Sequence, residues 1–274
     1  MPQNAKQLRT RIKSVDSTMH ITKAMELVAS SKLRRATDNM EASRPYFSAL
    51  DEAISHLSRV ESVFTKKTDG ARPCYIVMAG DRGLAGGYNN NIYKLLKAET
   101  DGRNAVVIAV GKRAADHAKK HGYNVILSID SIENATVADT YEIGKKVNEL
   151  FTSGETDEVN IIYTRYISML AQEPSVKKLL PITASDESKP KGEMLIEPSA
   201  GEVLKAVIPE YISGMTYGAV CESFASELSA RRNAMDSASK NAEEMIETLE
   251  LRYNRARQSA ITQEITEIIG GSSS

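Results

Sequence analysis

Residues 29–57, ASSKLRRATDNMEASRPYFSALDEAISHL, place an apolar or small side chain at every third or fourth position. The positions that share this face are Ala29, Leu33, Ala36, Met40, Ser43, Phe47, Leu50, Ile54 and Leu57. This spacing is typical of a helix with one buried face. Pro45 interrupts the sequence but not the phase of the pattern, so we expect a kinked helix that continues past the proline.

A second stripe of the same kind lies near the other end of the chain. Its apolar and small positions are Phe224, Leu228, Met235, Ala238, Ala242, Met245, Leu249, Tyr253, Ala256 and Ala260. The two patterns predict a first helix over residues 1–58 and a last helix over residues 208–270, beginning just after Pro209. Neither stripe has another partner of similar length, so we expect an antiparallel coiled coil. In that pairing Met25 should lie within a turn or two of the level of Met245.

Between the two helices the chain alternates between strand-like and helix-like segments. Strand patterns cover residues 74–79, 105–110, 123–129 and 158–166, and helical patterns cover residues 90–99, 112–121 and 137–151. This alternation predicts an α/β fold with a parallel sheet and crossover helices, a Rossmann-like domain over residues 72–185 inserted between the two helices. We expect residues 179–182 to add an edge strand. Residues 186–207 are predicted to be a linker, most polar at residues 186–192.

The composition limits the class of protein. Hydrophobic residues make up 41% of the chain, but aromatic residues only 5%, and Trp is absent. Such a composition suits helices packed by Ala, Met and Leu better than one large core. The longest apolar run, residues 105–110, is far shorter than the roughly 20 residues that cross a bilayer. Cys74 and Cys221 match no metal or redox spacing, so we expect reduced thiols of an intracellular protein.

The net charge of −1 conceals an asymmetry between the two ends. Residues 1–44 hold nine Lys or Arg and four Asp or Glu, whereas residues 204–269 hold seven and ten. Opposite signs suit two helices that lie side by side. The basic helix could also follow the phosphates of a nucleic acid, but it lacks interleaved aromatic residues. We therefore prefer a solvated face, or a face that meets an acidic protein.

A glycine-rich segment, GDRGLAGGYN at residues 80–89, separates the first strand from the next helix. A loop in this place can cradle a nucleotide phosphate. Its spacing is not GxGxxG, it lacks the Lys of a P-loop, and Asp81 would place a carboxylate near the phosphate. No acidic residue follows the next strand at residues 110–111, where a ribose would be bound. The segment is therefore expected to be a tight turn.

His117 and His121 are spaced like two metal ligands on one helix face. No third ligand is spaced to complete the site, so we expect a solvated helix face. No serine lies in a nucleophile elbow, and no other group of residues matches a catalytic constellation. The sequence predicts no catalytic residue, no metal site and no cofactor.

Three further segments carry a specific pattern. They are ITKAMELVA at residues 21–29, the loop GDRGLAGGYN at residues 80–89, and YNRARQSAITQEI at residues 253–265. Together they resemble the gamma subunit of F-type ATP synthase, and the resemblance covers essentially the whole chain. Ala85 stands where many members carry Cys, and the cysteine-bearing regulatory insertion of chloroplast members is absent. The compact length without a leader resembles bacterial members.

The resemblance implies a function. The terminal helices would form the rotor shaft inside a ring of three alpha and three beta subunits, and the α/β domain would lie next to the epsilon subunit and the c-ring. The chain would hydrolyse nothing itself. It would couple ion flow across the membrane to the conformational cycle of catalytic sites on its partners. Its location would be peripheral, at the cytoplasmic face of the cell membrane, and no nucleic acid would be bound.

The resemblance also implies partner contacts near the end of the last helix. Arg257 and Gln258 match a contact with a beta-subunit loop that includes a carboxylate, to which a guanidinium can make directional bonds. Ile265, Ile268 and Ile269 would lie in an apolar sleeve at the top of the ring.

Lys23, Met25 and Arg82 would, by the same resemblance, approach an acidic segment of the beta subunits. Met25 can equally be a residue that packs inside the coil. Two other classes of function stay open at this point: a nucleotide-binding enzyme that uses residues 80–89, and a coiled-coil scaffold or nucleic-acid-binding protein.

Overall fold

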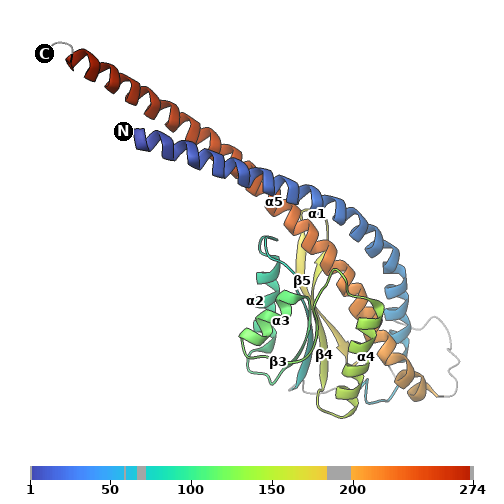
Figure 1. Cartoon of the computed structure of the whole chain (residues 1–274). Helices are drawn as coiled ribbons and strands as arrows, with labels where there is room; N and C mark the ends of the chain where they lie inside the picture. The colour runs from blue at the N-terminus through green and yellow to red at the C-terminus, as the bar shows by residue number, and fades with distance from the viewer. Residues whose placement is uncertain (1, 59, 67–71, 184–198, 272–274) are drawn as a thin grey trace. The chain divides into compact units, whose positions relative to one another are not determined.

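The computed structural model describes residues 2–58, 60–66, 72–183 and 199–271, and contains ten helices and strands within them (Figure 1). In chain order they are α1 (Pro2–Leu57), β1 (Pro73–Met78), α2 (Tyr88–Thr100), β2 (Val106–Val110), α3 (Lys112–Lys120), β3 (Asn124–Ile129), α4 (Val137–Thr152), β4 (Glu158–Tyr166), β5 (Gln172–Leu180) and α5 (Ala200–Gly271). The predicted alternation of strands and helices between two long helices is confirmed.

The chain divides into two compact units. The first combines residues 1–30 with residues 231–274, and the second consists of residues 31–230. Each unit therefore contains a part of both long helices, and the second also contains the sheet.

The second unit is built around a five-stranded sheet with the order β3-β2-β1-β4-β5. β1 pairs in parallel with β2 and β4, β2 pairs in parallel with β3, and only β5 is antiparallel to its neighbour β4. Every residue of β1 is buried, as expected of a central strand with helices on both faces.

The two faces of the sheet are covered by different helices (Figure 1). Tyr75 and Val77 of β1 point into a cluster with α2 and α3, where Ile92 and Leu96 are fully or almost fully buried. The alternate residues of β1 point into a larger cluster with α4, with the end of α1 and with the first turns of α5. This two-residue alternation follows from strand geometry and gives a three-layer α/β unit.

α1 and α5 also pack on each other within the second unit. Leu33, Ala36 and Met40 of α1 form a cluster with Ala225 and Leu228 of α5. The predicted stripe is thus buried. Two glycines of α5 permit a close approach further along. An added Cβ at Gly214 would lie 2.6 Å from Leu50, and one at Gly218 would lie 2.7 Å from Phe47.

In the first unit the two helices pair antiparallel, and two contacts set their register. The hydroxyl groups of Thr22 and Ser239 form a hydrogen bond of 2.7 Å. The Nε of Arg232 donates to the Oγ of Ser30 over 3.0 Å. The residue numbers of the two pairs add to almost the same value, as an antiparallel pair requires.

This register corrects the expectation that Met25 lies near the level of Met245. Counting three residues from the Thr22–Ser239 pair places Met25 level with Asp236. Met245 is nine residues further, about 13 Å along the helix. The apolar pattern could not decide between registers that differ by whole turns, because each offers a similar set of small residues.

The start of the last helix was also predicted wrongly. α5 begins at Ala200, and Pro209 lies inside it. The turns before the proline are held by burial, since Leu204 and Ile208 have no exposed surface. Such packing outweighs the loss of one backbone hydrogen bond. Residues 200–207 are therefore helical instead of a linker, and residues 186–198 lie outside the described residues.

The edge strand was predicted too late in the chain. β5 runs from Gln172 to Leu180, whereas residues 179–182 were expected. Only its last two residues are buried, and the earlier part of the strand carries charges and Pro174. An exposed edge strand tolerates such residues, so its hydrophobic pattern is weak.

Candidate functional site

The end of α5 extends beyond the start of α1. Counting twenty residues from the Thr22–Ser239 pair places Pro2 level with Ser259. Residues 260–271 of α5 therefore have no described residue of α1 beside them. The coiled coil ends in a single helix.

This single helix has an apolar tip. Ile265, Ile268 and Ile269 expose 51%, 71% and 61% of their surface. Large apolar side chains that gather at an exposed end are a common sign of a partner-binding surface. The three residues named from the resemblance thus share one accessible place.

Arg257 and Gln258 lie two to three turns before the helix end. Both are exposed. Neither side chain forms a hydrogen bond or ion pair with the rest of the described chain, so both are available to a partner. A guanidinium offers a planar fork of donors that fits a carboxylate.

The other predicted contact residues lie elsewhere. Lys23 is exposed and Met25 is half-buried on α1. Arg257 is level with Asn4, 19 residues before Lys23, so the two cations are separated by about 28 Å along the coil. Arg82 is exposed and belongs to the other compact unit. The structure therefore does not bring the eight residues into one site.

The glycine-rich segment forms a hydrogen-bonded turn. The amide of Gly80 donates to the Oδ1 of Asn89 over 2.9 Å, and the Nδ2 of Asn89 donates to the carbonyl of Arg82 over 3.3 Å. Gly86 has a positive φ of 56°, and the neighbouring Leu84 has one of 63°. The first and last residues of the segment are thus tied together, as expected of a tight turn.

Asp81 in this turn has a structural role that the sequence did not reveal. Its Oδ1 accepts from the amide of Ile132 over 2.9 Å, and its Oδ2 accepts from the Oγ of Ser131 over 2.7 Å. The carboxylate therefore joins the turn to the loop after β3. These partners are 50 residues further along the chain, and no local pattern could have indicated them.

The packing of the turn disfavours a bound phosphate. An added Cβ at Gly80 would lie 2.5 Å from the carboxyl carbon of Glu227, which is only 2% exposed. With Asp81, two carboxyl groups lie next to the place where a nucleotide phosphate would be held in an α/β fold. Gly80 allows α5 to pack closely on the end of β1.

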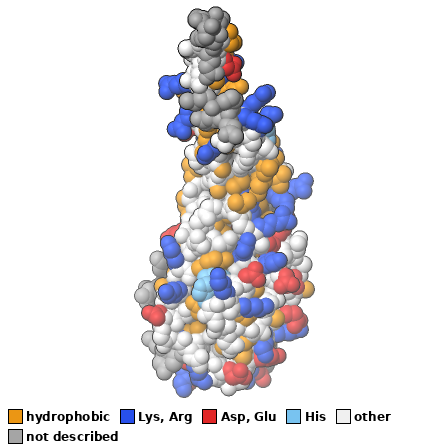
Figure 2. All heavy atoms as spheres, turned by 60° about the vertical axis from the view of Figure 1, so that its left-hand side comes forward, with side chains coloured by type: hydrophobic (Ala, Val, Ile, Leu, Met, Phe, Trp, Pro, Cys, Tyr) orange, Lys and Arg blue, Asp and Glu red, His pale blue; other side chains and the backbone are white. Residues whose placement is uncertain are grey.

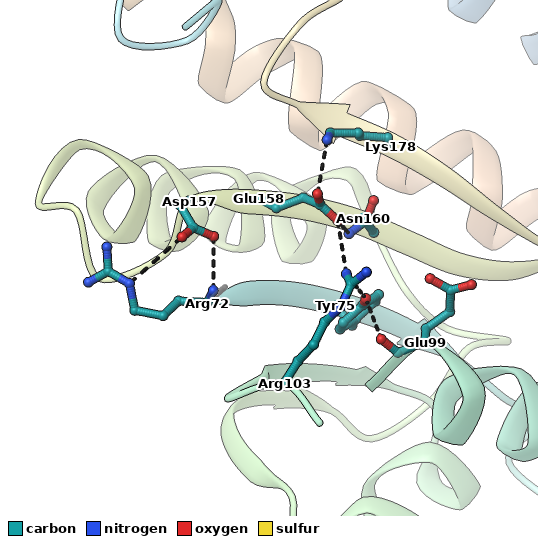
Figure 3. Close-up of polar contacts among 8 residues, drawn as sticks. All are labelled: Arg72, Tyr75, Glu99, Arg103, Asp157, Glu158, Asn160 and Lys178. Atoms are coloured by element: carbon teal, nitrogen blue, oxygen red, sulfur yellow. Dashed lines mark hydrogen bonds and ion pairs between the residues drawn. The ribbon is translucent and has the colours of Figure 1, made fainter. Parts of the chain in front are cut away.

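A polar network joins the amino ends of the strands (Figure 3). The carboxylate of Glu158 accepts from the Nζ of Lys178 over 2.9 Å and from the Nδ2 of Asn160 over 2.7 Å, and lies 3.6 Å from the Nη1 of Arg103. Arg103 also donates to the hydroxyl of Tyr75 over 3.2 Å. Figure 3 shows these side chains converging between β1, β4 and β5. The network is a structural junction.

The electrostatics of Glu158 follow from this geometry. Burial raises its pKa, but the hydrogen bonds from Asn160 and Lys178 and the charges of Lys178 and Arg103 outweigh burial. The pKa of the carboxyl group is therefore held below its usual value. Glu158 and Asn160 are two residues apart on β4, so strand alternation alone would have placed them on one face.

The two neighbouring histidines take part in an aromatic stack. The rings of Tyr93 and His117 are stacked with centroids 3.7 Å apart, and His121 continues the stack at 4.0 Å. Burial, the nearby His121 and Lys120 lower the pKa of His117. Among the described residues no group of three or more His, Cys, Asp or Glu could hold a metal ion.

Both cysteines are free thiols. Burial raises the pKa of Cys74 to about 12, so its thiol stays protonated and unreactive at neutral pH. Burial also raises the pKa of Cys221.

The comparison with known sequences gives a consistent result. The family model described as ATP synthase matches residues 4–274. The ATP synthase gamma chain of Ruminococcus albus is 48% identical over 279 residues, which cover 98% of each chain. The sodium ion specific ATP synthase gamma chain of Acetobacterium woodii is 42% identical, with 99% of this chain and 98% of the relative covered.

Solved structures share the fold. A chain from the mitochondrial ATP synthase of Euglena gracilis, described as OSCP/F1/c-ring, has a TM-score of 0.75 at 19% identity and covers 100% of this chain and 95% of its own length. A chain from the central stalk and c-ring of the Tetrahymena thermophila enzyme has a TM-score of 0.63 at 23% identity, and covers 80% and 99%.

Proposed function

The chain belongs to the ATP synthase gamma chain family, and we infer from this that it is the central shaft of a rotary ATP synthase. It is a non-catalytic subunit. The assembled complex couples ATP synthesis and hydrolysis to ion transport, and the chemistry takes place on partner subunits. The shaft transmits rotation to those subunits, so its role lies in its surface and its stiffness.

The observation that carries the contact proposal is the single-helix end of α5. Its apolar tip, Ile265, Ile268 and Ile269, is exposed in the isolated chain and requires a cover of matching chemistry. We propose that the alpha and beta subunits of the catalytic ring form this cover. Arg257 and Gln258 then meet a carboxylate-bearing loop of a beta subunit at certain rotor angles only, which gives each catalytic site a different contact energy.

Lys23, Met25 and Arg82 are proposed as further contacts with the beta subunits. Lys23 and Arg82 are exposed cations, which suits an acidic segment. Because they lie far from the tip or in the other unit, they would contact the ring separately from Arg257. Half-buried Met25 contributes mainly to packing in the coil.

The remaining partners follow from the family. We propose that the α/β unit contacts the epsilon subunit and the c-ring, and that the complex is attached to the cytoplasmic face of the cell membrane. No described helix has an apolar stretch sufficient to cross a bilayer. Attachment of this chain would therefore depend on its partners.

The rival functions have less support. A nucleotide-binding enzyme would need the loop at residues 80–89, where Asp81 and Glu227 oppose a phosphate. A nucleic-acid-binding protein would need a continuous basic surface. In Figure 2 Lys and Arg side chains are mixed with Asp and Glu over the α/β unit, although Lys and Arg predominate on the coiled coil.

The contact proposal is tested with Arg257→Ala in the assembled enzyme. A charge-assisted hydrogen bond contributes roughly 1.5–3 kcal/mol, enough to shift a two-state partner about tenfold. We expect normal assembly, because most of the interface lies elsewhere, but lower ATP turnover and lower ATP-driven ion pumping. Arg257→Lys should recover only part of the loss, since an ammonium lacks the planar fork.

Arg252→Ala is the matched control. Arg252 is also exposed on α5 and carries the same charge, but lies outside the segment at residues 253–265. Equal turnover and pumping in the wild type, Arg257→Ala and Arg252→Ala would show that Arg257 makes no angle-dependent contact.

A further inference from the structure

A groove of about 470 Å³ opens in the α/β unit, between α1, α5 and the hairpin of β4 and β5. Its apolar part includes Met40, Ile161 and Met215, which are buried or nearly so. This volume lies within the range of small-molecule sites. No contact proposed above for the shaft uses the groove.

The two carboxylates of the groove are already matched by cations. The Nη2 of Arg44 lies 3.3 Å from the Oε1 of Glu222. The Nζ of Lys177 lies 2.9 Å from the Oδ2 of Asp51, whose other oxygen accepts from the hydroxyl of Tyr211 over 3.2 Å. These pairs connect α1 to α5 and to β5, and they leave no carboxylate in the groove without a cation.

Two donors of the groove have no such partner. Arg165 is exposed and forms no hydrogen bond or ion pair with the rest of the described chain, and the same holds for the hydroxyl of half-buried Tyr163. They are two residues apart on β4 and so point to the same face of the sheet. Glu173 is paired opposite Arg165 on β5 but forms no ion pair with it within the described residues.

The protonation states favour an anion. Burial, aided by the charges of Glu222 and Asp51, raises the pKa of Tyr163 to about 12. Tyr163 therefore remains a hydrogen-bond donor at neutral pH. The lining contains three cations, Arg44, Arg165 and Lys177, against the two matched carboxylates. A guanidinium and a hydroxyl beside an apolar surface form a site for one anionic group on an apolar body.

We propose that this groove binds a small organic anion, whose carboxylate or phosphate accepts hydrogen bonds from Arg165 and Tyr163 and whose apolar body packs against Met40 and Ile161. A ligand there would contact α1 and β4 together. It would therefore join the first helix of the α/β unit to the sheet, and its site is independent of the proposed partner contacts.

The test is calorimetric titration of the full-length chain with phenyl phosphate and with benzoate. We expect saturable binding of at least one of them, competition by inorganic phosphate if the phosphate is preferred, and no comparable binding of phenol, which has the ring without the charge. Arg165→Gln should weaken binding about tenfold or more, because it removes the charged donor. Tyr163→Phe should weaken it less.

Two further variants control the result. Arg35→Gln changes the charge equally at an exposed position of α1 outside the groove, and should bind like the wild type. Ser48→Tyr fills the groove without changing its charge, and should abolish binding. Thermal melting checks that each variant is folded. No saturable binding at about 1 mM ligand, or equal affinity in Arg165→Gln and Arg35→Gln, would overturn the proposal.

Discussion

At the scale of single residues, buried and half-buried carboxylates explain much of how the α/β unit is joined. Asp81 ties the glycine turn to the loop after β3, and Glu158 ties β4 to β5 and to Arg103. Each carboxylate accepts bonds from residues far away in sequence. Each therefore stabilises tertiary structure and has no part in chemistry.

Glu158→Gln tests this role. The pKa of Glu158 is lowered in the folded chain, so its stabilisation is present above the ordinary value of 4.5 and is lost as the pH falls through the folded value. We expect the variant to lower the free energy of unfolding by about 1–3 kcal/mol at neutral pH. The difference from wild type should shrink on acidification, measured by urea unfolding at several pH values.

Glu61→Gln removes the same charge from an exposed position and should leave the unfolding free energy nearly unchanged throughout. If the Glu158→Gln difference stayed constant into strongly acidic solution, the carboxylate would not be the source of the stabilisation.

At the scale of elements, close helix contacts depend on glycines. A Cβ at Gly144 of α4 would overlap the carbonyl oxygen of Pro209 and lie 3.3 Å from the amide nitrogen of Ser213, both in α5. Backbone atoms cannot rotate away as a side chain can. We expect Gly144→Ala to lower the free energy of unfolding by about 1–3 kcal/mol. In contrast, Gly201→Ala meets no atom within 4 Å and should be neutral or stabilising by up to about 1 kcal/mol. Equal melting temperatures for the two variants would contradict this account.

The register of the coiled coil gives a second prediction for elements. The Thr22 and Ser239 oxygens are 2.7 Å apart, so their Cβ atoms are near enough for a disulfide. In a chain without its native cysteines, Thr22→Cys with Ser239→Cys should crosslink on mild oxidation, as judged by gel mobility. Met25→Cys with Met245→Cys should not, and efficient crosslinking of that pair would require another register.

At the scale of the whole molecule, stability and function should separate at the α5 tip. Ile268 and Ile269 are exposed, so replacing both with Ser should change the unfolding free energy of the isolated chain by no more than about 0.5 kcal/mol. The assembled enzyme should nevertheless lose turnover, because the partner surface would face hydroxyl groups. Ile92→Ser, at a fully buried position, should instead unfold the isolated chain. Unchanged turnover of the Ile268 and Ile269 variant would remove the tip from the contact surface.

The sequence predicted those features that local periodicity controls. The stripe at Leu33, Ala36 and Met40 is buried, and the predicted strand at residues 158–166 has the bounds of β4. Periodicity failed where distant packing decides. Pro209 is tolerated inside α5 because the preceding turns are buried, and β5 carries too few buried residues to show a pattern.

The candidate contacts were found by resemblance and not by pattern, since an exposed Arg257 differs from any other helical charge only by its place in a motif. The groove around Arg165 had no sequence signal. Its residues come from α1, β4, β5 and α5, and only the folded chain brings them together.

The antiparallel pairing also affects how the protein is made. The residues joined by the Thr22–Ser239 hydrogen bond are 217 positions apart in the chain. At a synthesis rate of about 5–20 residues per second, the first helix waits roughly 10–40 s for its partner to be translated. During that time the apolar stripe of the nascent chain has no permanent cover. The ribosome-bound segment is therefore an expected client of chaperones, and its biogenesis should depend on them more than that of the α/β unit.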